Sequence, residues 1–190
     1  MSSSQQRQVA VRAFAEEFND ASHLFKESDD EMAPKYALLP TGKRANRVFV
    51  VGTLTEVEDV GSDSEYWKGR VVDPTGTFFV YAGQYQPEAA AFLRSSDPPE
   101  FVSAVGKPRS FETDEGNMNV TLRPEHINVV DRETKANWVC ETAERTLDRI
   151  DAYDPTGDAE DVLAAQKQYE PSMGTYRSAV ADALDSIRDD

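Results

Sequence analysis

Five stretches in the middle of the chain alternate between apolar and polar residues, which is the pattern of strands buried on one face. Val, Phe, Tyr and Thr are frequent in them, and these side chains favour an extended backbone. Turn-forming residues separate the stretches, for example Pro74 and Gly76 after the second and Gly116 after the fourth. The pattern predicts five strands, at residues 47–60, 65–73, 77–82, 101–112 and 118–131.

An alanine-rich segment between the third and fourth strands is typical of a helix. Pro87 suits the first turn of a helix, and Pro98 and Pro99 follow its end. Three strands, one helix and two strands is the order of the OB-fold, a five-stranded Greek-key barrel. An SH3-like barrel would also supply five strands, but not a helix at that point. We therefore expect a mainly β fold with α-helices: a five-stranded OB-fold barrel flanked by an N-terminal helix and by C-terminal helices.

Helical periodicity replaces the alternation at both ends of the chain. In residues 5–27, apolar side chains recur every three to five positions, which predicts an amphipathic helix that an extended linker follows. Similar spacing predicts C-terminal helices over 133–152, 158–168 and 174–188. The chain thus divides into an N-terminal helical extension and linker, 1–42, an OB-fold domain, 43–132, and an acidic C-terminal helical region for partner association, 133–190.

The chain is strongly acidic, with 35 Asp and Glu against 20 Lys and Arg among 190 residues and a net charge of −15. The excess is uneven, because residues 133–190 contribute −8, residues 43–132 contribute −4 and residues 1–42 contribute −3. A carboxylate-rich surface repels polyanions such as nucleic acid, but it also stays soluble at high salt, where screening removes the repulsion. We favour adaptation to salt over the alternative of an ordinary acidic cytoplasmic protein.

Several classes of protein have no support in the sequence. No run is long and apolar enough to span a membrane, and the N-terminus lacks the apolar segment of a signal peptide, so we expect a cytoplasmic protein. One cysteine, Cys140, and two histidines argue against a disulfide and a usual zinc site, and Cys140 is interpreted as a buried, inert thiol. Because there is no glycine-rich phosphate loop and no nucleophile beside a histidine, we expect no enzyme, cofactor or metal.

The alternation on the second and third strands separates an inner from an outer face. Val71, Phe78 and Val80 fit the barrel interior, so their neighbours point outward. In OB-folds this outer face, with the loops between strands one and two and between strands four and five, holds single-stranded nucleic acid. Such binding needs cations for the phosphates and flat rings for the bases. The candidate nucleic-acid-binding residues are Tyr66, Lys68, Arg70, Phe79, Tyr81, Lys107, Arg109, Phe111 and Arg123.

Other roles stay open for these residues. Outward aromatic rings on a small barrel are often covered by an appended helix, and they can also contact a protein partner. Lys43, Arg44 and Arg47 form a second group of cations before the first strand. They either serve the same groove or offset the surrounding acid.

Three longer stretches carry more specific information: YALLPTG at 36–42, NRVFVVGTL at 46–54 and YWKGRVVDPTGTFFVY at 66–81. They resemble a family of haloarchaeal proteins that are encoded beside replication protein A. The resemblance implies a protein that forms a complex with a replication protein A subunit and acts in DNA replication and repair. It also implies a layout similar to that of the middle subunit of eukaryotic replication protein A, in which one OB-fold is followed by helices.

The resemblance suggests a role for the helix expected at 133–152, because in the replication protein A core the helix after each OB-fold joins a bundle between subunits. The candidate residues for this partner helix are Trp138, Val139, Ala143, Leu147 and Ile150. The alternative is that the stripe packs on the chain's own barrel.

Taken together, the sequence predicts a non-enzymatic OB-fold protein that associates with a replication protein A subunit and contributes to single-stranded DNA binding in replication and repair. No membrane or small-molecule partner is expected. The alternative is an assembly protein for replication protein A whose barrel does not itself bind DNA.

Overall fold

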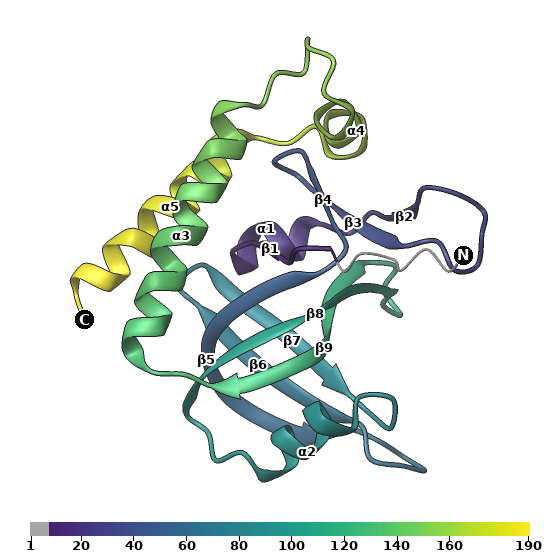
Figure 1. The fold of residues 1–190 in the computed structure, drawn as a ribbon, viewed down its shortest axis with the longest axis vertical. Helices are drawn as coiled ribbons and strands as arrows, with labels where there is room; N and C mark the ends of the chain where they lie inside the picture. Colours follow the sequence, from purple (N-terminus) through teal and green to yellow (C-terminus); the bar gives the residue numbers. More distant parts are fainter. Residues whose placement is uncertain (1–7) are drawn as a thin grey trace, which may run out of the picture.

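Five long strands close into a barrel in the computed structural model, which describes residues 8–190 (Figure 1). They are β5 (Val48–Asp59), β6 (Trp67–Asp73), β7 (Gly76–Ala82), β8 (Glu100–Glu112) and β9 (Met118–Val129). Neighbours pair in the order β5, β6, β7, β9, β8, and β8 pairs back with β5. The β7–β9 pairing is parallel and the other barrel pairings are antiparallel. With α2 (Pro87–Ser95) between β7 and β8, the predicted fold class is confirmed.

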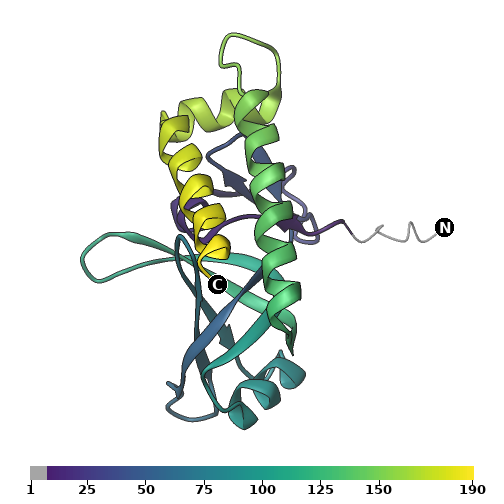
Figure 2. The same ribbon diagram turned by 90° about the vertical axis from the view of Figure 1, so that its left-hand side faces the viewer.

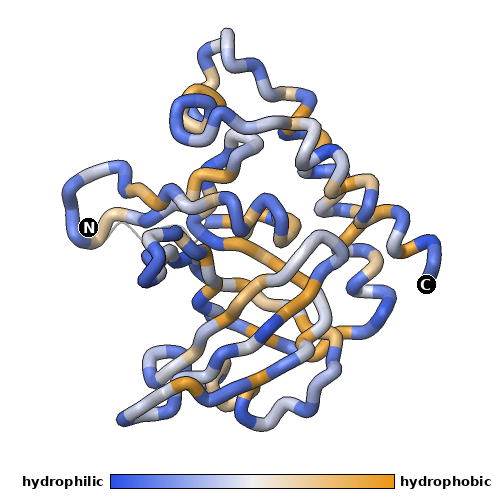
Figure 3. The backbone as a smooth tube through the Cα atoms, turned by 180° about the vertical axis from the view of Figure 1, so that it is seen from behind, coloured by the Kyte–Doolittle hydropathy of each residue, from blue (hydrophilic) through white to orange (hydrophobic). Residues whose placement is uncertain are grey.

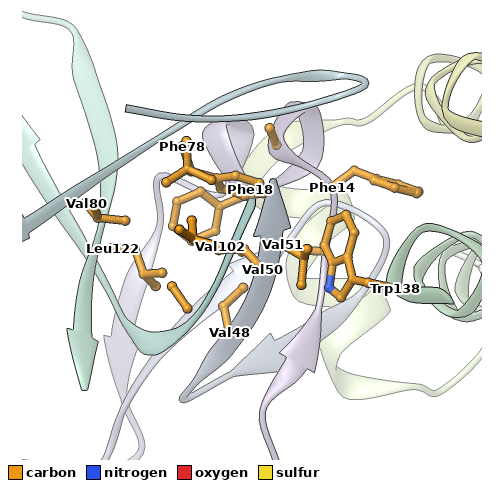
Figure 4. Close-up of a cluster of buried hydrophobic side chains, with 14 of the residues drawn as sticks. Phe14, Phe18, Val48, Val50, Val51, Phe78, Val80, Val102, Leu122 and Trp138 are labelled. Carbon is orange, nitrogen blue, oxygen red and sulfur yellow. The ribbon is translucent and has the colours of Figure 1, made fainter. Parts of the chain in front are cut away.

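Side chains alternate between the inside and the outside of the barrel, and Figure 3 shows the matching alternation of hydropathy along the strands. Val71, Phe78 and Val80 are fully buried, as predicted. Phe18, from α1 (Ala15–Asp20), packs on Phe78 with 5.4 Å between the ring centroids (Figure 4). The two short helices therefore cover opposite ends of the barrel, α1 above and α2 below in the view of Figure 1.

The N-terminal segment is not the long helix that we expected over residues 5–27. Residues 5–7 of that helix lie outside the described part of the chain. The remainder forms β1 (Val11–Arg12), the six-residue α1 and β2 (Leu24–Lys26). In a small antiparallel sheet, β3 (Lys35–Leu39) pairs with both β2 and β4 (Lys43–Ala45).

Hydrogen bonds to distant residues decide where the N-terminal helix begins. The Val11 N–H donates to the Arg47 carbonyl at 2.8 Å, and this holds β1 in a parallel pairing with β5. The Asp73 carboxylate accepts a hydrogen bond from the Ala15 N–H at 2.8 Å, so α1 begins at Ala15. Asp73 lies 58 residues further along the chain, and the apolar spacing contains no information about it.

Three helices follow the barrel, close to their predicted bounds: α3 (Arg132–Asp151), α4 (Glu160–Tyr169) and α5 (Met173–Arg188). The Asp131 side chain caps α3 by accepting a hydrogen bond from the Thr134 N–H. α3 and α5 run side by side, and α4 lies against β3 and β4 (Figure 2). The expectation of a buried Cys140 is wrong, because this residue lies on the exposed side of α3.

The apolar stripe of α3, which we interpreted as a seam for a partner helix, packs within the chain. Its buried side chains are Trp138, Val139, Ala143 and Ile150, and Leu147 is partly buried. Trp138 donates from Nε1 to the Phe49 carbonyl at 3.1 Å, and the Phe14 ring meets it edge-on at 5.4 Å (Figure 4). The barrel and α5 thus occupy the surface that a partner helix would need, which corrects the interpretation as an open seam.

A buried ion pair joins the N-terminal segment to α3. Arg149 Nη2 lies 2.8 Å from Glu17 Oε1, and Glu17 is only 2% exposed. The other oxygen of Glu17 accepts from the Thr41 N–H at 2.9 Å, and Arg149 Nε donates to the Thr41 hydroxyl at 2.7 Å. The hydrophobic core likewise draws on the N-terminal segment, the barrel and the C-terminal helices together.

Candidate nucleic-acid interface

Three rings and two cations gather on the outer face of β6 and β7. The antiparallel register places Lys68 opposite Tyr81 and Arg70 opposite Phe79. Because alternate residues along a strand share a face, these four side chains point away from the core. Tyr66, in the loop before β6, completes the group. We call Tyr66, Lys68, Arg70, Phe79 and Tyr81 the aromatic patch.

Two contacts arrange the side chains of the aromatic patch. Lys68 Nζ lies 4.8 Å from the centroid of the Phe79 ring, which is a cation–π distance. Tyr66 stacks on Tyr81 with 5.6 Å between centroids and an interplanar angle of 25°. Tyr66 is still 44% exposed, so the stack ends in a ring that solvent reaches.

Gly83 makes room for the Tyr66 ring. A Cβ at position 83 would lie 2.8 Å from Tyr66 Cδ2, closer than real Cβ contacts. The main chain of Tyr66 is also held, because its N–H donates to Asp59 Oδ1 at 3.1 Å. That bond and a second one from the Gly61 N–H lower the pKa of Asp59. Hydrogen bonds therefore fix the backbone of the loop before β6, from which the Tyr66 ring projects.

A second group of cations lies on β8 and β9. Lys107 stands directly opposite Arg123 in the register, and Arg109 follows two positions along β8. We call Lys107, Arg109 and Arg123 the basic cluster. Burial lowers the pKa of Lys107, and the charges of Arg47, Arg123 and Arg109 lower it further, against an opposing effect of Glu125. Burial and then Arg123 lower the pKa of Arg109. The cations of the cluster therefore repel one another, and a bound anion would relieve that repulsion.

A parallel contact between β7 and β9 joins the two groups. Val80 pairs with Leu122, so the next residues along the two strands, Tyr81 and Arg123, are neighbours on the outer face. The register then runs across four strands, through Lys68, Tyr81, Arg123 and Lys107. The predicted residues thus lie in two adjoining groups around the barrel, except for Phe111. Phe111 lies further along the β8–β9 hairpin, opposite Asn119, and is 44% exposed.

The five cations of these two groups have no ionic partner in the described part of the chain. None of them has a side-chain nitrogen within 4.0 Å of a carboxylate oxygen in residues 8–190. Glu56 and Glu58 on β5 stand opposite Arg70 and Lys68 in the register without forming such a pair. These cations are therefore not held in close ion pairs by the described residues, with Glu56, Glu58 and Glu125 as the acidic neighbours that a ligand would have to outcompete.

The cations before β5 are in a different situation. Arg44 pairs with Asp161 at 2.8 Å, and its hydrogen bond to that carboxylate raises its pKa. Arg47 Nε lies 2.7 Å from Glu125 Oε1. Arg44 and Arg47 thus neutralise nearby carboxylates, which was one of the two roles left open for them. Lys43 is exposed.

Helices α3, α4 and α5 pack away from the aromatic patch. α3 lies on β1, β5 and α5, and α4 lies on β3 and β4 (Figures 1 and 2). α1 touches the first residues of β7, where Asn19 donates to the Thr77 carbonyl at 2.8 Å. The Phe79 and Tyr81 side chains remain partly exposed, so the structure does not favour their burial beneath the C-terminal helices.

Tyr85 belongs to this surface, although the sequence argument passed over it. It lies in the loop between β7 and α2 and is 84% exposed. It lines a hollow of about 770 Å³ together with Lys107, Arg123 and His126. A signal was present, since an aromatic residue in the polar segment 83–86 directly follows the third strand. Strand alternation does not extend into a loop, so the alternating pattern does not predict the position of Tyr85.

Two further features of the described residues concern other kinds of site. In residues 8–190, no group of three or more His, Cys, Asp or Glu side chains is placed to hold a metal ion. No helix in this part of the chain is both long and apolar enough to cross a membrane.

No family model and no curated protein matches the sequence. Solved structures do match. An OBody bound to hen egg-white lysozyme is 17% identical, with a TM-score of 0.38 over 45% of this chain and 80% of that chain. The mitochondrial single-stranded DNA binding protein Rim1 of S. cerevisiae is 18% identical, with a TM-score of 0.35 over 45% of this chain and 92% of that chain.

A longer match extends beyond the barrel. The structure of yeast Stn1 and Ten1 aligns over 86% of this chain and 85% of that chain, with 9% identity and a TM-score of 0.51. At this identity the likeness concerns the fold alone. With the closed five-stranded barrel and its flanking helices, it shows that the chain has an OB-fold.

Proposed function

We propose that this protein binds single-stranded DNA on the outer face of β6, β7 and β9, as a non-enzymatic OB-fold protein that associates with a replication protein A subunit in DNA replication and repair. One observation carries the proposal: the aromatic patch adjoins the basic cluster, and their five cations have no ionic partner in residues 8–190.

The chemistry of a single strand fits this arrangement. Bases stack on aromatic rings whatever their sequence, and each such contact is worth about 1–3 kcal/mol. Tyr66 offers an exposed ring at the end of a stack, and Phe79 would offer its ring once Lys68 moved to a phosphate. The five cations, which lie on β6, β8 and β9, would then contact phosphates along the backbone of the bound DNA.

The net charge of −15 argues for stacking as the main source of affinity. Each phosphate contact of a single strand contributes about 0.7 to the slope of log affinity against log salt, so contacts to phosphate weaken steeply in concentrated salt. Stacking depends on the ring faces and much less on ionic strength. We therefore expect the rings to matter more than the cations at molar salt.

A titration of labelled oligothymidylate at molar salt tests the proposal. Phe79→Ala with Tyr81→Ala should weaken binding by at least tenfold, because two stacking contacts of about 1–3 kcal/mol each are lost. Lys68→Ala with Arg70→Ala should weaken it less. Leu163→Ala and Arg177→Ala, at exposed positions of α4 and α5, are the matched apolar and charged controls. Equal loss in both patch variants would contradict the role of stacking.

The association with replication protein A is proposed from the resemblance of residues 36–54 and 66–81. Co-expression with a candidate subunit, followed by purification on a tag carried by the subunit, tests it. The alternative, an assembly protein whose barrel does not bind DNA, is favoured by the overall negative charge. A stable complex without any oligonucleotide binding, with or without the subunit, would establish that alternative instead.

A further inference from the structure

A second basic hollow lies between β8 and the β2–β3 hairpin of the N-terminal segment. It has a volume of about 810 Å³. Glu31 is the one carboxylate among its lining side chains within residues 8–190. The lining cations come from three separate segments and are Lys26, Lys35, Arg47, Lys107 and Arg109.

Hydrogen bonds hold the walls of this hollow together. Arg47 donates from Nη1 to Asn46 Oδ1 at 3.0 Å, and Asn46 donates from Nδ2 to the Lys35 carbonyl at 2.8 Å. On the hairpin, Lys26 Nζ donates to the Glu31 carbonyl at 3.2 Å. Together with the ion pair between Arg47 and Glu125 at 2.7 Å, these bonds join the hairpin to the barrel strand β9 at the hollow.

The hollow continues the surface of the proposed binding face. It shares Lys107 with the hollow that Tyr85 and Arg123 line. That hollow in turn shares Tyr85 with a third one, about 400 Å³ in volume, beside Tyr66 and Gly83. The three hollows therefore share lining residues in succession, from Tyr66 past Tyr85 and Lys107 to the hairpin.

We propose that a single strand bound on the aromatic patch continues past Arg123 and Lys107, and that phosphates of its backbone occupy the hollow between β8 and the β2–β3 hairpin. This inference rests on the proposed function and gives the strand a path away from the barrel. Arg47 is paired with Glu125, and the other four lining cations have no carboxylate within 4.0 Å in residues 8–190. Phosphate is the matching chemistry because of these four cations, and because the described lining has no aromatic ring on which a base could stack. Burial is the main cause that lowers the pKa of Lys107, and the neighbouring cations lower it further. An anion in the hollow would reduce that second contribution.

The test compares a short oligothymidylate of about 5 nucleotides with a long one of about 15, two lengths near the ends of the usual range of OB-fold site sizes, about 4–16 nucleotides. Lys26→Gln with Lys35→Gln removes the two hairpin cations, which line the hollow and lie outside the proposed binding face. This variant should leave the short oligonucleotide's affinity unchanged and weaken the long one's. For the long one, the slope of log affinity against log salt should fall by about 1.4, for two phosphates at about 0.7 each. Over a fourfold rise in salt, the wild-type affinity should therefore fall about sevenfold more than the variant's.

Two further variants complete the design. Lys167→Gln with Arg177→Gln removes two exposed cations from α4 and α5, away from the hollow, and should change neither slope nor affinity. Glu31→Gln removes the lining carboxylate and should tighten the long oligonucleotide about twofold, in the opposite direction to the cation variants. Thermal melting followed by circular dichroism checks that each variant is folded.

The outcomes separate this inference from the function on which it rests. If the wild type binds neither oligonucleotide, the proposed function fails. If the wild type binds both, and Lys26→Gln with Lys35→Gln leaves the salt slope and the length dependence as they were, only the path into the hollow is overturned. Loss of affinity for the long oligonucleotide alone, with the reduced slope, supports the path.

Discussion

Arg149 on α3 and the cations of the barrel face have opposite surroundings. On α3, Arg149 is held by the buried Glu17 and by Thr41. On the barrel face, Arg70 and Lys107 have no carboxylate within 4.0 Å in the described residues. The acidic chain thus pairs Arg149 with a buried carboxylate where its segments join, and leaves the cations beside the aromatic patch without a close ion pair in the described residues. This difference indicates which cations stabilise the fold and which are available to a ligand.

Replacing one cation in each region should give the largest effect. Arg149→Ala leaves the Glu17 carboxylate buried without its partner, which costs about 3–5 kcal/mol in the free energy of unfolding. Arg70→Ala breaks no ion pair in the described residues and should change that free energy by less than about 0.5 kcal/mol. Chemical denaturation followed by circular dichroism measures both. Unfolding of the two variants at the same denaturant concentration would remove the contrast on which the comparison depends.

A substitution that alters no charge, Gly83→Ala, tests the aromatic patch itself. Gly83→Ala places a Cβ 2.8 Å from Tyr66 Cδ2, so the Tyr66 ring must leave its position on Tyr81. Losing one stacking position should weaken oligothymidylate binding about tenfold, with the salt slope unchanged. Gly174→Ala is the matched control, because its nearest neighbour would be 3.6 Å away. An unaltered affinity in Gly83→Ala would show that the Tyr66 ring does not contact bases.

A further difference concerns pH and the packing of α4. The Tyr169 hydroxyl donates to the Leu38 carbonyl at 2.8 Å, and burial is the main cause that raises the pKa of Tyr169 from 10.0 to about 12. Because the unfolded chain loses this proton first, its contribution to stability is complete below pH 10 and is lost as the pH rises towards 12. The free energy of unfolding, measured by chemical denaturation at a series of pH values between 10 and 12, should fall less with pH in Tyr169→Phe than in the wild type. Tyr85→Phe, at an exposed ring, is the control, and equal slopes in both variants would contradict the assignment.

Much of the barrel was predictable because the alternation of apolar and polar residues along each strand indicates which side chains face the core. Val71 and Val80 alternate with outward residues, and that local pattern is enough to place both inside. The outward set at Lys68, Phe79 and Tyr81 followed from the same pattern. Burial of the Trp138 stripe could not be assigned in advance, since an apolar helix face looks the same whether its partner is another chain or its own barrel.

Local patterning in the sequence was therefore sufficient for the strands, the helix between the third and fourth of them, and the inner and outer faces of the barrel. Contacts between distant residues decided the rest. Asp73 sets the start of α1, the β7–β9 pairing brings Tyr81 beside Arg123, and the β2–β3 hairpin adds Lys26 and Lys35 to the basic surface. The physical reason is that hydropathy depends on each residue and its near neighbours, whereas hydrogen bonds and charge clusters depend on which distant segments the closed barrel brings together.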